Sequence, residues 1–192
     1  METFLSLQGE GAYQGELAYF IRVAGCDVGC SWCDVKESWD AEKHAVMSVE
    51  DIVNGIDSTA KFVVITGGEP LMYNLDHLCQ EIKSKGMRIH LETSGAYPLS
   101  GEFDWICLSP KKFKAPLQEV FDKADELKVI AVNKSDFSWG EEQAQHVRSE
   151  CRLFFQAEWD KKDKMYPLIY SYIAEHPRWT LSLQSHKYLG LP

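Results

Sequence analysis

Residues 18–33 read AYFIRVAGCDVGCSWC, so that an apolar stretch runs directly into three closely spaced cysteines. The apolar part, residues 18–24, is rich in aromatic and β-branched side chains and predicts a buried strand. The cysteines that follow it are side chains that bind metals. The same arrangement, in which a strand ends in reactive or polar side chains, recurs along the rest of the chain.

Six further runs have the composition of buried strands, and helical patterns lie between them. The strand-like runs cover residues 61–66, 88–92, 104–108, 126–132, 152–156 and 179–184. The helical patterns begin at Ser48 and Asn74 or cover residues 138–150 and 163–176. Ser48 and Asp51 have the spacing of a helix-start signature, which supports the first of these helices.

Alternating strands and helices predict parallel strands joined by right-handed crossovers, which form either a doubly wound sheet or a barrel. A nucleotide-binding doubly wound sheet is disfavoured, because Gly9-Glu10-Gly11 lacks a further glycine and precedes the first strand-like run. Polar residues after successive strands favour a barrel, whose active site lies at the carboxyl ends of its strands. A complete barrel takes roughly 250 residues. The 192 residues therefore predict an abbreviated, incomplete parallel (β/α) barrel with about six core strands, in a single domain spanning residues 1–192.

Composition excludes several classes of function. The chain has 20 Lys and Arg against 29 Asp and Glu, and this net charge of −9 disfavours a nucleic-acid partner. No leader peptide or apolar run of about 18 residues indicates export or a membrane partner, so we expect a cytoplasmic protein. Cytoplasmic thiols stay reduced. Of the six cysteines, Cys79, Cys107 and Cys151 stand apart from one another and are expected to be core residues.

The other three cysteines, Cys26, Cys30 and Cys33, form a C-x3-C-x2-C motif. Three thiolates on one loop can hold three irons of a 4Fe-4S cluster, which leaves the fourth iron open to a chelating molecule. One alternative is a structural zinc site with His44, Cys79 or Asp34 as its fourth ligand. Another is an electron-transfer cluster with a distant fourth cysteine. The spacing favours the open cluster, because zinc sites usually place their cysteines in C-x2-C pairs.

This motif resembles the signature of the radical S-adenosylmethionine (SAM) superfamily, whose members bind a 4Fe-4S cluster through the same spacing. Thr66-Gly67-Gly68-Glu69-Pro70 resembles the superfamily's GGEP motif, which binds the amino group of the methionine moiety. Glycines permit close backbone approach, and Glu69 can accept a hydrogen bond from an ammonium group. A lone Gly-Gly-Glu-Pro is also an ordinary turn, but behind a C-x3-C-x2-C loop it is specific. The resemblance implies a partial barrel of the radical SAM type.

Several further segments are similar to the family of 7-carboxy-7-deazaguanine synthases within that superfamily. They are Leu7-Gln8-Gly9-Glu10-Gly11, Phe20-Ile21-Arg22, Cys30-Ser31-Trp32-Cys33-Asp34, Glu92-Thr93-Ser94-Gly95, Ser109-Pro110-Lys111 and QSHKYLGLP at residues 184–192. The resemblance implies a lyase of queuosine biosynthesis, which converts 6-carboxy-5,6,7,8-tetrahydropterin into 7-carboxy-7-deazaguanine with loss of ammonia. Cluster-bound SAM would give a 5′-deoxyadenosyl radical that takes hydrogen from C6 of the pterin. The resemblance also implies a homodimer and an electron donor such as flavodoxin.

The resemblance assigns a role to each matching position. The catalytic metal ligands, which hold the cluster, are Cys26, Cys30 and Cys33. The SAM site comprises Thr66, Gly67, Gly68, Glu69, Ser94, Ser109, Lys111 and Gln156. The pterin site comprises Gln8, Glu10, Arg22, Thr93, His186 and the carboxylate of Pro192. This fits their chemistry, because Glu10 suits the N–H donors of the pterin's guanidine-like edge and Arg22 suits its carboxyl group.

One position departs from the family, which commonly has a Thr after Cys-Asp, with a hydroxyl that approaches a magnesium ion. This chain reads Asp34-Val35, and the side chain of Val35 has no oxygen to offer a hard cation. Asp34 or Ser38 could substitute, substrate and water could hold the ion, or magnesium is dispensable. Two other functions stay open. One is a glycyl-radical activating enzyme of the same superfamily, which the QGEG and QSHKYLGLP segments disfavour, and the other is a non-catalytic iron–sulfur or zinc protein.

Overall fold

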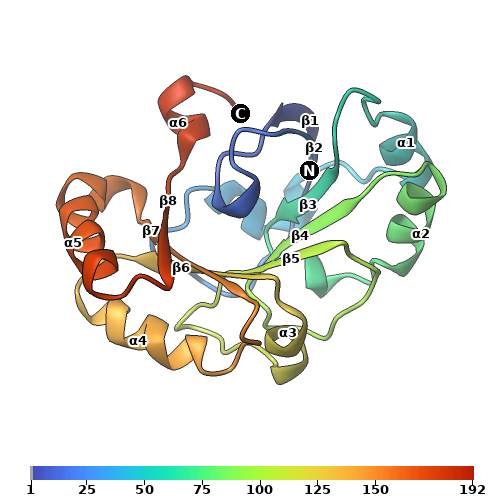
Figure 1. Ribbon diagram of the computed structural model, residues 1–192. Helices are drawn as coiled ribbons and strands as arrows, with labels where there is room; N and C mark the ends of the chain where they lie inside the picture. The colour runs from blue at the N-terminus through green and yellow to red at the C-terminus, as the bar shows by residue number, and fades with distance from the viewer. Residues whose placement is uncertain (1) are drawn as a thin grey trace.

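Eight strands form one sheet that curves around a central space, and the computed structural model describes it with its helices over residues 2–192 (Figure 1). The strands are β1 (Glu2–Leu7), β2 (Leu17–Val23), β3 (Val63–Gly67), β4 (Ile89–Thr93), β5 (Trp105–Leu108), β6 (Glu126–Ala131), β7 (Arg152–Ala157) and β8 (Trp179–Ser182). Their order in the sheet is their order in the chain. β1 is antiparallel to β2, and β2 to β8 are parallel. Among the described residues β8 does not pair with β1, so the barrel is open.

The incomplete parallel barrel expected from the sequence is confirmed. All seven strand-like runs are strands, β2 to β8. The parallel part therefore has one strand more than the expected six or so, because β8 continues the sheet beyond β7. β1 was not expected. It pairs along its whole length with β2, with Glu2 opposite Arg22 and Phe4 opposite Phe20, and such an antiparallel partner needs only a short connection.

The helices lie mainly on the outer side of the sheet, whereas α6 lies at the open end, near the start of the chain (Figure 1). They are α1 (Val49–Asn54), α2 (Asp76–Ser84), α3 (Gln118–Lys123), α4 (Ser135–Ala144), α5 (Lys162–Glu175) and α6 (Ser185–Leu189). Single 3-10 turns are η1 (Gly11–Tyr13), η2 (Lys36–Trp39), η3 (Ala41–Lys43), η4 (Pro70–Met72) and η5 (Trp159–Lys161). No helix in the described part of the chain has the length and apolar character that crossing a bilayer requires.

Local hydrogen bonds explain where the helices begin. The start of α1 is confirmed, since Ser48 Oγ accepts from the backbone N–H of Asp51 at 3.0 Å. The helix expected over residues 138–150 is instead α4, which lies earlier in the chain. Its Asp136 carboxylate accepts from two backbone N–H groups at the end of β6 and so starts the helix directly after the strand. The short helices α3 and α6 were not expected.

The two faces of the sheet have different contents because side chains alternate along each strand. On β3, Val63 and Ile65 point toward the helices and belong to the main apolar core. Phe62 and Val64 belong to a separate cluster with Ala18, on the inner side. Near the amino-terminal ends of the strands, aromatic rings close the barrel interior. Their contacts include Phe62 stacked on His90 with ring centroids 4.0 Å apart, and Tyr13 packed on Trp105 at 5.0 Å.

Candidate active site

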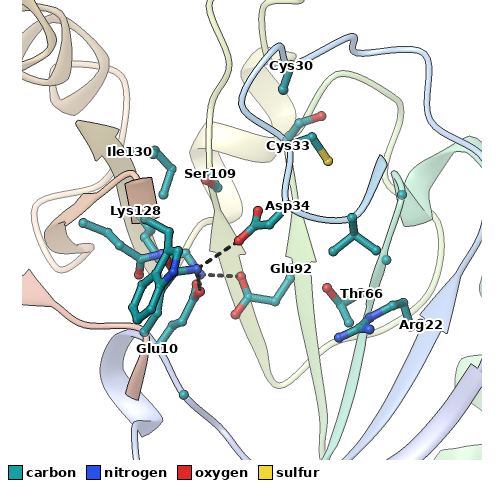
Figure 2. A pocket seen from close by; sticks show the side chains of 18 of the residues that line it. Glu10, Arg22, Cys30, Cys33, Asp34, Thr66, Glu92, Ser109, Lys128 and Ile130 are labelled. Atoms are coloured by element: carbon teal, nitrogen blue, oxygen red, sulfur yellow. Dashed lines mark hydrogen bonds and ion pairs between the residues drawn. The ribbon is translucent and has the colours of Figure 1, made fainter. Parts of the chain in front are cut away.

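One cavity of about 290 Å³ lies at the carboxyl ends of the strands, above this aromatic floor (Figure 2). Every residue that the sequence placed in a site lines it. These residues are Gln8, Glu10, Arg22, Cys26, Cys30, Cys33, Thr66, Gly67, Gly68, Glu69, Thr93, Ser94, Ser109, Lys111, Gln156, His186 and Pro192. The structure thus brings together side chains from both ends of the chain and from most of its parallel strands.

The cysteine loop follows β2 and is held by backbone hydrogen bonds. Gly25 N–H donates to Ser38 O at 2.6 Å, and Cys33 N–H donates to Cys30 O at 3.0 Å. All three thiols of the loop are free, and Cys30 is buried. Burial raises the pKa of Cys26 and of Cys30, and the neighbouring thiols raise both further. A metal centre that replaces these protons would be bound by three thiolates of one loop.

The donor set fits a 4Fe-4S cluster better than a single zinc ion. Thiolates bound to one zinc ion at about 2.3 Å bring their sulfur atoms to within about 4 Å of one another. Among the described residues, the one group of three potential ligands whose atoms all lie within 4.8 Å is Glu92, Cys107 and Glu126. The sulfurs of Cys26, Cys30 and Cys33 are therefore spread more widely, as the larger cluster requires.

The two glycines after β3 let its end pack against the cysteine loop. Gly68 N–H donates to Val23 O at 2.9 Å, and Glu69 N–H donates to Gly25 O at the same distance. A Cβ atom on Gly68 would lie 2.2 Å from Gly25 O and 3.1 Å from the Cβ of Cys26. Any side chain at Gly68 would thus push the cysteine loop away from β3. Glycine is therefore required here for packing as well as for the close backbone approach expected from the motif.

The carboxylate of Glu69 is buried, with 1% of the residue exposed, and it binds the end of β4. It accepts from Thr93 Oγ1 at 2.5 Å, Ser94 N–H at 2.7 Å, Ser94 Oγ at 2.5 Å and Leu71 N–H at 3.1 Å. Four donors match the roughly four acceptor positions of a carboxylate. Contact of Glu69 with an ammonium group stays a prediction, because protein donors already occupy its oxygens.

Lys111 places an ammonium group beside Trp32 of the cysteine loop. Its Nζ donates to Ser109 O at 2.7 Å and to Ser109 Oγ at 2.6 Å, and it lies 5.5 Å from the ring centre of Trp32. Burial lowers the pKa of Lys111, while the Cys30 thiol opposes that shift. On β7, Gln156 Oε1 accepts from Ser182 Oγ at 2.7 Å.

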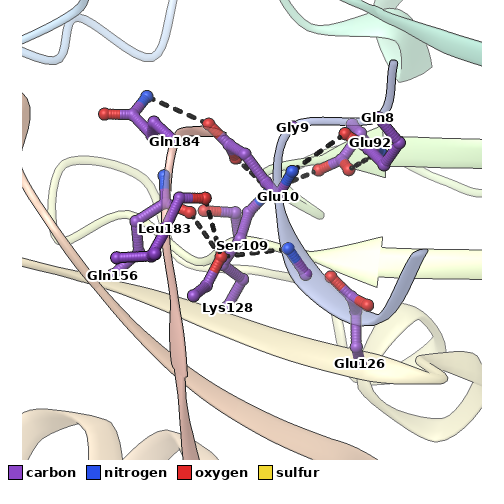
Figure 3. A network of polar contacts seen from close by, with 12 residues as sticks. Gln8, Gly9, Glu10, Glu92, Ser109, Glu126, Lys128, Gln156, Leu183 and Gln184 are labelled. Atoms are coloured by element: carbon purple, nitrogen blue, oxygen red, sulfur yellow. Dashed lines mark hydrogen bonds and ion pairs between the residues drawn. The ribbon is translucent and has the colours of Figure 1, made fainter. Parts of the chain in front are cut away.

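A second group of polar side chains lies on the far side of the cavity (Figure 3). Gln184 Nε2 donates to Glu10 Oε1 at 3.0 Å, and Gln8 Nε2 donates to Glu92 Oε1 at 3.2 Å. Burial alone would raise the pKa of Glu10, but the charge and hydrogen bond of Lys128 bring it down to about 2. Glu10 is therefore an ionised acceptor at neutral pH.

Arg22 and Pro192 lie at the rim of the cavity, where β1 holds both. Arg22 Nη1 pairs with Glu2 Oε1 at 2.6 Å, and its guanidinium lies 4.9 Å from the ring centre of Phe4. Ser6 Oγ donates to Pro192 O at 3.2 Å. β1, which was not predicted from the sequence, therefore positions Arg22 and Pro192, which were.

Lys128 and Glu92 line the cavity but were not assigned a role from the sequence. Lys128 Nζ lies 2.6 Å from Glu10 Oε2 and 2.8 Å from Glu92 Oε2. A signal for Lys128 exists in the sequence, because Glu126 and Lys128 are charged residues two apart in an otherwise apolar strand. Cys107 is buried as expected, yet it faces the inner side beside Glu92 and Glu126, since alternation points Ile106 and Leu108 toward the helices.

The side chains that follow the cysteine motif offer few oxygens to a magnesium ion. Val35 has no side-chain oxygen. Asp34 already pairs with the Lys187 ammonium and accepts from Gln184 Nε2 at 3.3 Å. Ser38 is buried, and its hydroxyl donates to Val35 O at 2.7 Å. Of the two expected substitutes, only Asp34 keeps an oxygen, Oδ1, that these contacts do not occupy.

An open parallel barrel with three free cysteines behind its first parallel strand defines a radical SAM protein, and the radical SAM superfamily model matches residues 20–130. A 7-carboxy-7-deazaguanine synthase from Flavobacterium psychrophilum is 52% identical over 192 residues, which is 100% of this chain and 91% of the relative. One from Synechocystis sp. is 51% identical, covering 99% and 91%. The chain belongs to the family of 7-carboxy-7-deazaguanine synthases. The crystal structure of QueE from Escherichia coli matches with a TM-score of 0.81 at 29% identity, covering 96% of this chain and 92% of that one.

Proposed function

We propose that this protein converts 6-carboxy-5,6,7,8-tetrahydropterin into 7-carboxy-7-deazaguanine with loss of ammonia. The observation that carries the proposal is the convergence of two sets of residues on one cavity. The cysteine loop and the Gly67–Gly68 turn form one end, and the QGEG loop and the segment from Gln184 form the other. A cluster protein with only an electron-transfer role has no need for the second end.

The residues of the chain divide the work between the two ends. Cys26, Cys30 and Cys33 hold the cluster, and Lys111 supplies positive charge beside it. Together with SAM, the bound cluster supplies the one-electron chemistry that removes a hydrogen atom from the substrate carbon. Glu10 accepts from the N–H edge of the pterin, and Arg22, which keeps donors besides the one bonded to Glu2, binds its carboxyl group.

The experiment uses the full chain, reconstituted anaerobically with iron and sulfide and supplied with SAM, a reductant and the tetrahydropterin. We expect about four irons per chain, a change in the cluster's electron paramagnetic resonance on adding SAM, and 7-carboxy-7-deazaguanine detected by mass spectrometry. A folded, cluster-loaded protein that leaves the pterin unconsumed contradicts the substrate. Colourless protein that contains zinc contradicts the radical chemistry as well.

Magnesium is proposed to be dispensable for turnover, because the side chains after the cysteine motif offer it few oxygens. The side chain of Val35 lacks an oxygen, the Ser38 hydroxyl is bonded to Val35 O, and Asp34 Oδ2 is paired with the Lys187 ammonium. We therefore expect turnover to change less than about twofold when divalent cations are removed by a chelating resin and the iron content stays constant. A loss of turnover that added magnesium restores contradicts this expectation.

Four further properties follow from the family resemblance and belong to the same proposal. They are a single radical SAM domain spanning residues 1–192, a homodimer, a cytoplasmic location, and reduction by a donor such as flavodoxin. Support for the first is that one sheet runs through the described residues. Light scattering of the reconstituted protein tests the dimer, and turnover with flavodoxin in place of a chemical reductant tests the donor.

A further inference from the structure

We propose that Lys128 is a positioning residue for the pterin, because its ammonium group holds Glu10 and Glu92 together as two ionised acceptors at the substrate end of the cavity. The inference rests on the proposed function for the identity of the substrate. The two carboxylates face the substrate, and the lysine keeps them charged and in place.

The geometry is that of a bridge between distant parts of the chain (Figure 2). Glu10 lies in the loop after β1, Glu92 on β4 and Lys128 on β6. The lysine Nζ is 2.6 Å from one carboxylate and 2.8 Å from the other, and only 4% of the Lys128 side chain is exposed. Buried charge-assisted hydrogen bonds of this length are strong and directional, so the lysine fixes the spacing of the two carboxylates.

Each carboxylate is also held from its other oxygen (Figure 3). Glu10 Oε1 accepts from Gln184 Nε2 at 3.0 Å, and Glu92 Oε1 accepts from Gln8 Nε2 at 3.2 Å. A carboxylate has about four acceptor positions, so both groups keep acceptor capacity for a ligand. Both line the cavity. A planar edge with several N–H donors is the chemistry that such a pair recognises.

Charge balance explains why an ammonium group is needed there. The charged and titratable groups around the bridge are Glu126, Cys107, His186 and Lys111, and Asp34 is joined to Glu10 through Gln184. Without Lys128, two carboxylates would share a buried site, and their repulsion would raise the pKa of one of them. A protonated carboxyl group would then present a donor to the pterin's own donors. The low pKa of Glu10, about 2, is consistent with the lysine preventing this.

The main test compares Lys128→Met with the wild type. The double variant Lys128→Met/Glu126→Gln removes one positive and one negative charge and so keeps the formal charge of the interior. It is compared with the wild type if the single variant folds poorly. Glu126 does not line the cavity. The matched control is Lys83→Met, which removes a lysine that pairs with Asp104 at 2.6 Å on the outside of α2.

For the Lys128 variants we expect the KM for the pterin to rise at least tenfold and turnover to fall on the acid side as pH drops below about 7. Iron content and the effect of SAM on the cluster's paramagnetic resonance should not change. Lys83→Met should leave the KM and the pH profile as in the wild type. Lower thermal stability of the Lys128 variants with an unchanged KM and pH profile would show that the lysine only supports the fold, and would overturn the proposal.

A measurement without turnover separates this inference from the proposed function. Glutamate labelled with carbon-13 at its carboxyl group is titrated in the wild type and in the double variant. We expect one carboxyl group to titrate near neutral pH in the variant alone. If the wild type makes no product but this signal appears, the substrate is wrong and the role of Lys128 in ionisation stands. If the two titrations coincide, the proposal for Lys128 is wrong even when product forms.

Discussion

The floor and the cavity of the barrel interior are built by the same strands, yet they differ in almost every physical respect. On β4, His90 stacks on Phe62 in the floor, and Glu92, two residues further, pairs with Lys128 in the cavity. Two residues along a strand span about 6.6 Å. Over that distance the interior changes from close-packed aromatic rings to hydrogen-bonded charges.

This difference shows how the fold supports a charged site. Burial of the aromatic side chains stabilises the protein by roughly 25 cal/mol per Å² of apolar surface. Buried charges contribute little net stability and cost free energy when a partner is lost. The floor should therefore determine stability and the cavity should determine activity. Substitutions in each region test that separation.

The largest effect is expected from the cysteine loop. Cys30→Ala removes one of three cluster ligands, so we expect iron and turnover to fall below detection. Cys79→Ala is the matched control, because Cys79 is also buried but packs in the apolar core. Iron analysis and product formation of both variants provide the measurement. A Cys30→Ala variant that keeps its full iron content contradicts the assignment of the loop.

In the floor, Phe62→Ala should lower the free energy of unfolding by about 3–5 kcal/mol, since it leaves a cavity beneath His90 and Tyr13. Phe62 is fully buried and does not line the active-site cavity. We expect the KM for the pterin to stay within about twofold of the wild type at low temperature. Urea unfolding and steady-state kinetics measure the two quantities, and a large change in KM would break the separation of floor and cavity.

The converse substitution is Glu10→Gln in the cavity. It keeps the size of the side chain but removes the charge, so we expect a rise of roughly 10- to 100-fold in the KM for the pterin. The free energy of unfolding should fall by about 1–2 kcal/mol, less than for Phe62→Ala, because Lys128 loses one charged partner but keeps Glu92. Glu16→Gln, in the same segment but outside the cavity, is the control. Equal kinetic effects in both variants would contradict a specific role for Glu10.

The smallest effect concerns the pH dependence of stability. Burial, together with the charge of Arg88, lowers the pKa of His90 to about 4, while Asp104 opposes the shift. The unfolded chain takes up this proton near pH 6.5. Stability is therefore retained above that pH and lost as the pH falls toward 4, by about 2 kcal/mol between pH 7 and 5.

His90→Phe should remove this contribution and flatten the pH dependence of the urea midpoint. The imidazole Nε2 is buried without a hydrogen-bond partner in the described structure, so a phenyl ring leaves no polar group unsatisfied. If the variant and the wild type lose the same stability between pH 7 and 5, protonation of His90 is not responsible.

Much of the fold could be predicted from local sequence patterns, because buried parallel strands are continuous apolar runs. β1 could not, since ETFLSL is short and partly polar and becomes a strand only through its pairing with β2. For α3, six residues are too few for a periodic pattern to stand out. These elements depend on tertiary partners that a local pattern does not contain.

The site residues also fall into those that the sequence predicts and those that only the fold brings together. The cysteine motif, the Gly67–Gly68 turn and the QGEG segment are readable because their spacing along the chain carries the chemistry. The bridge from Lys128 to Glu10 and Glu92 joins positions separated by 118 and 36 residues. Only the order and register of the strands bring these residues together. The sequence predicted a parallel barrel but not which side chains of its strands would meet.

The contact between the two ends of the chain has a consequence for synthesis in the cell. Ser185 N–H and Ser185 Oγ both donate to Gly9 O, at 2.9 Å and 3.1 Å, so residues from 184 onward complete a wall that begins with the QGEG loop. The ribosome makes the cysteine loop early and these residues after every strand. A nascent or prematurely terminated chain would carry all three cluster ligands beside a cavity that is still open to water and oxygen. Cluster insertion is therefore best timed after release of the chain.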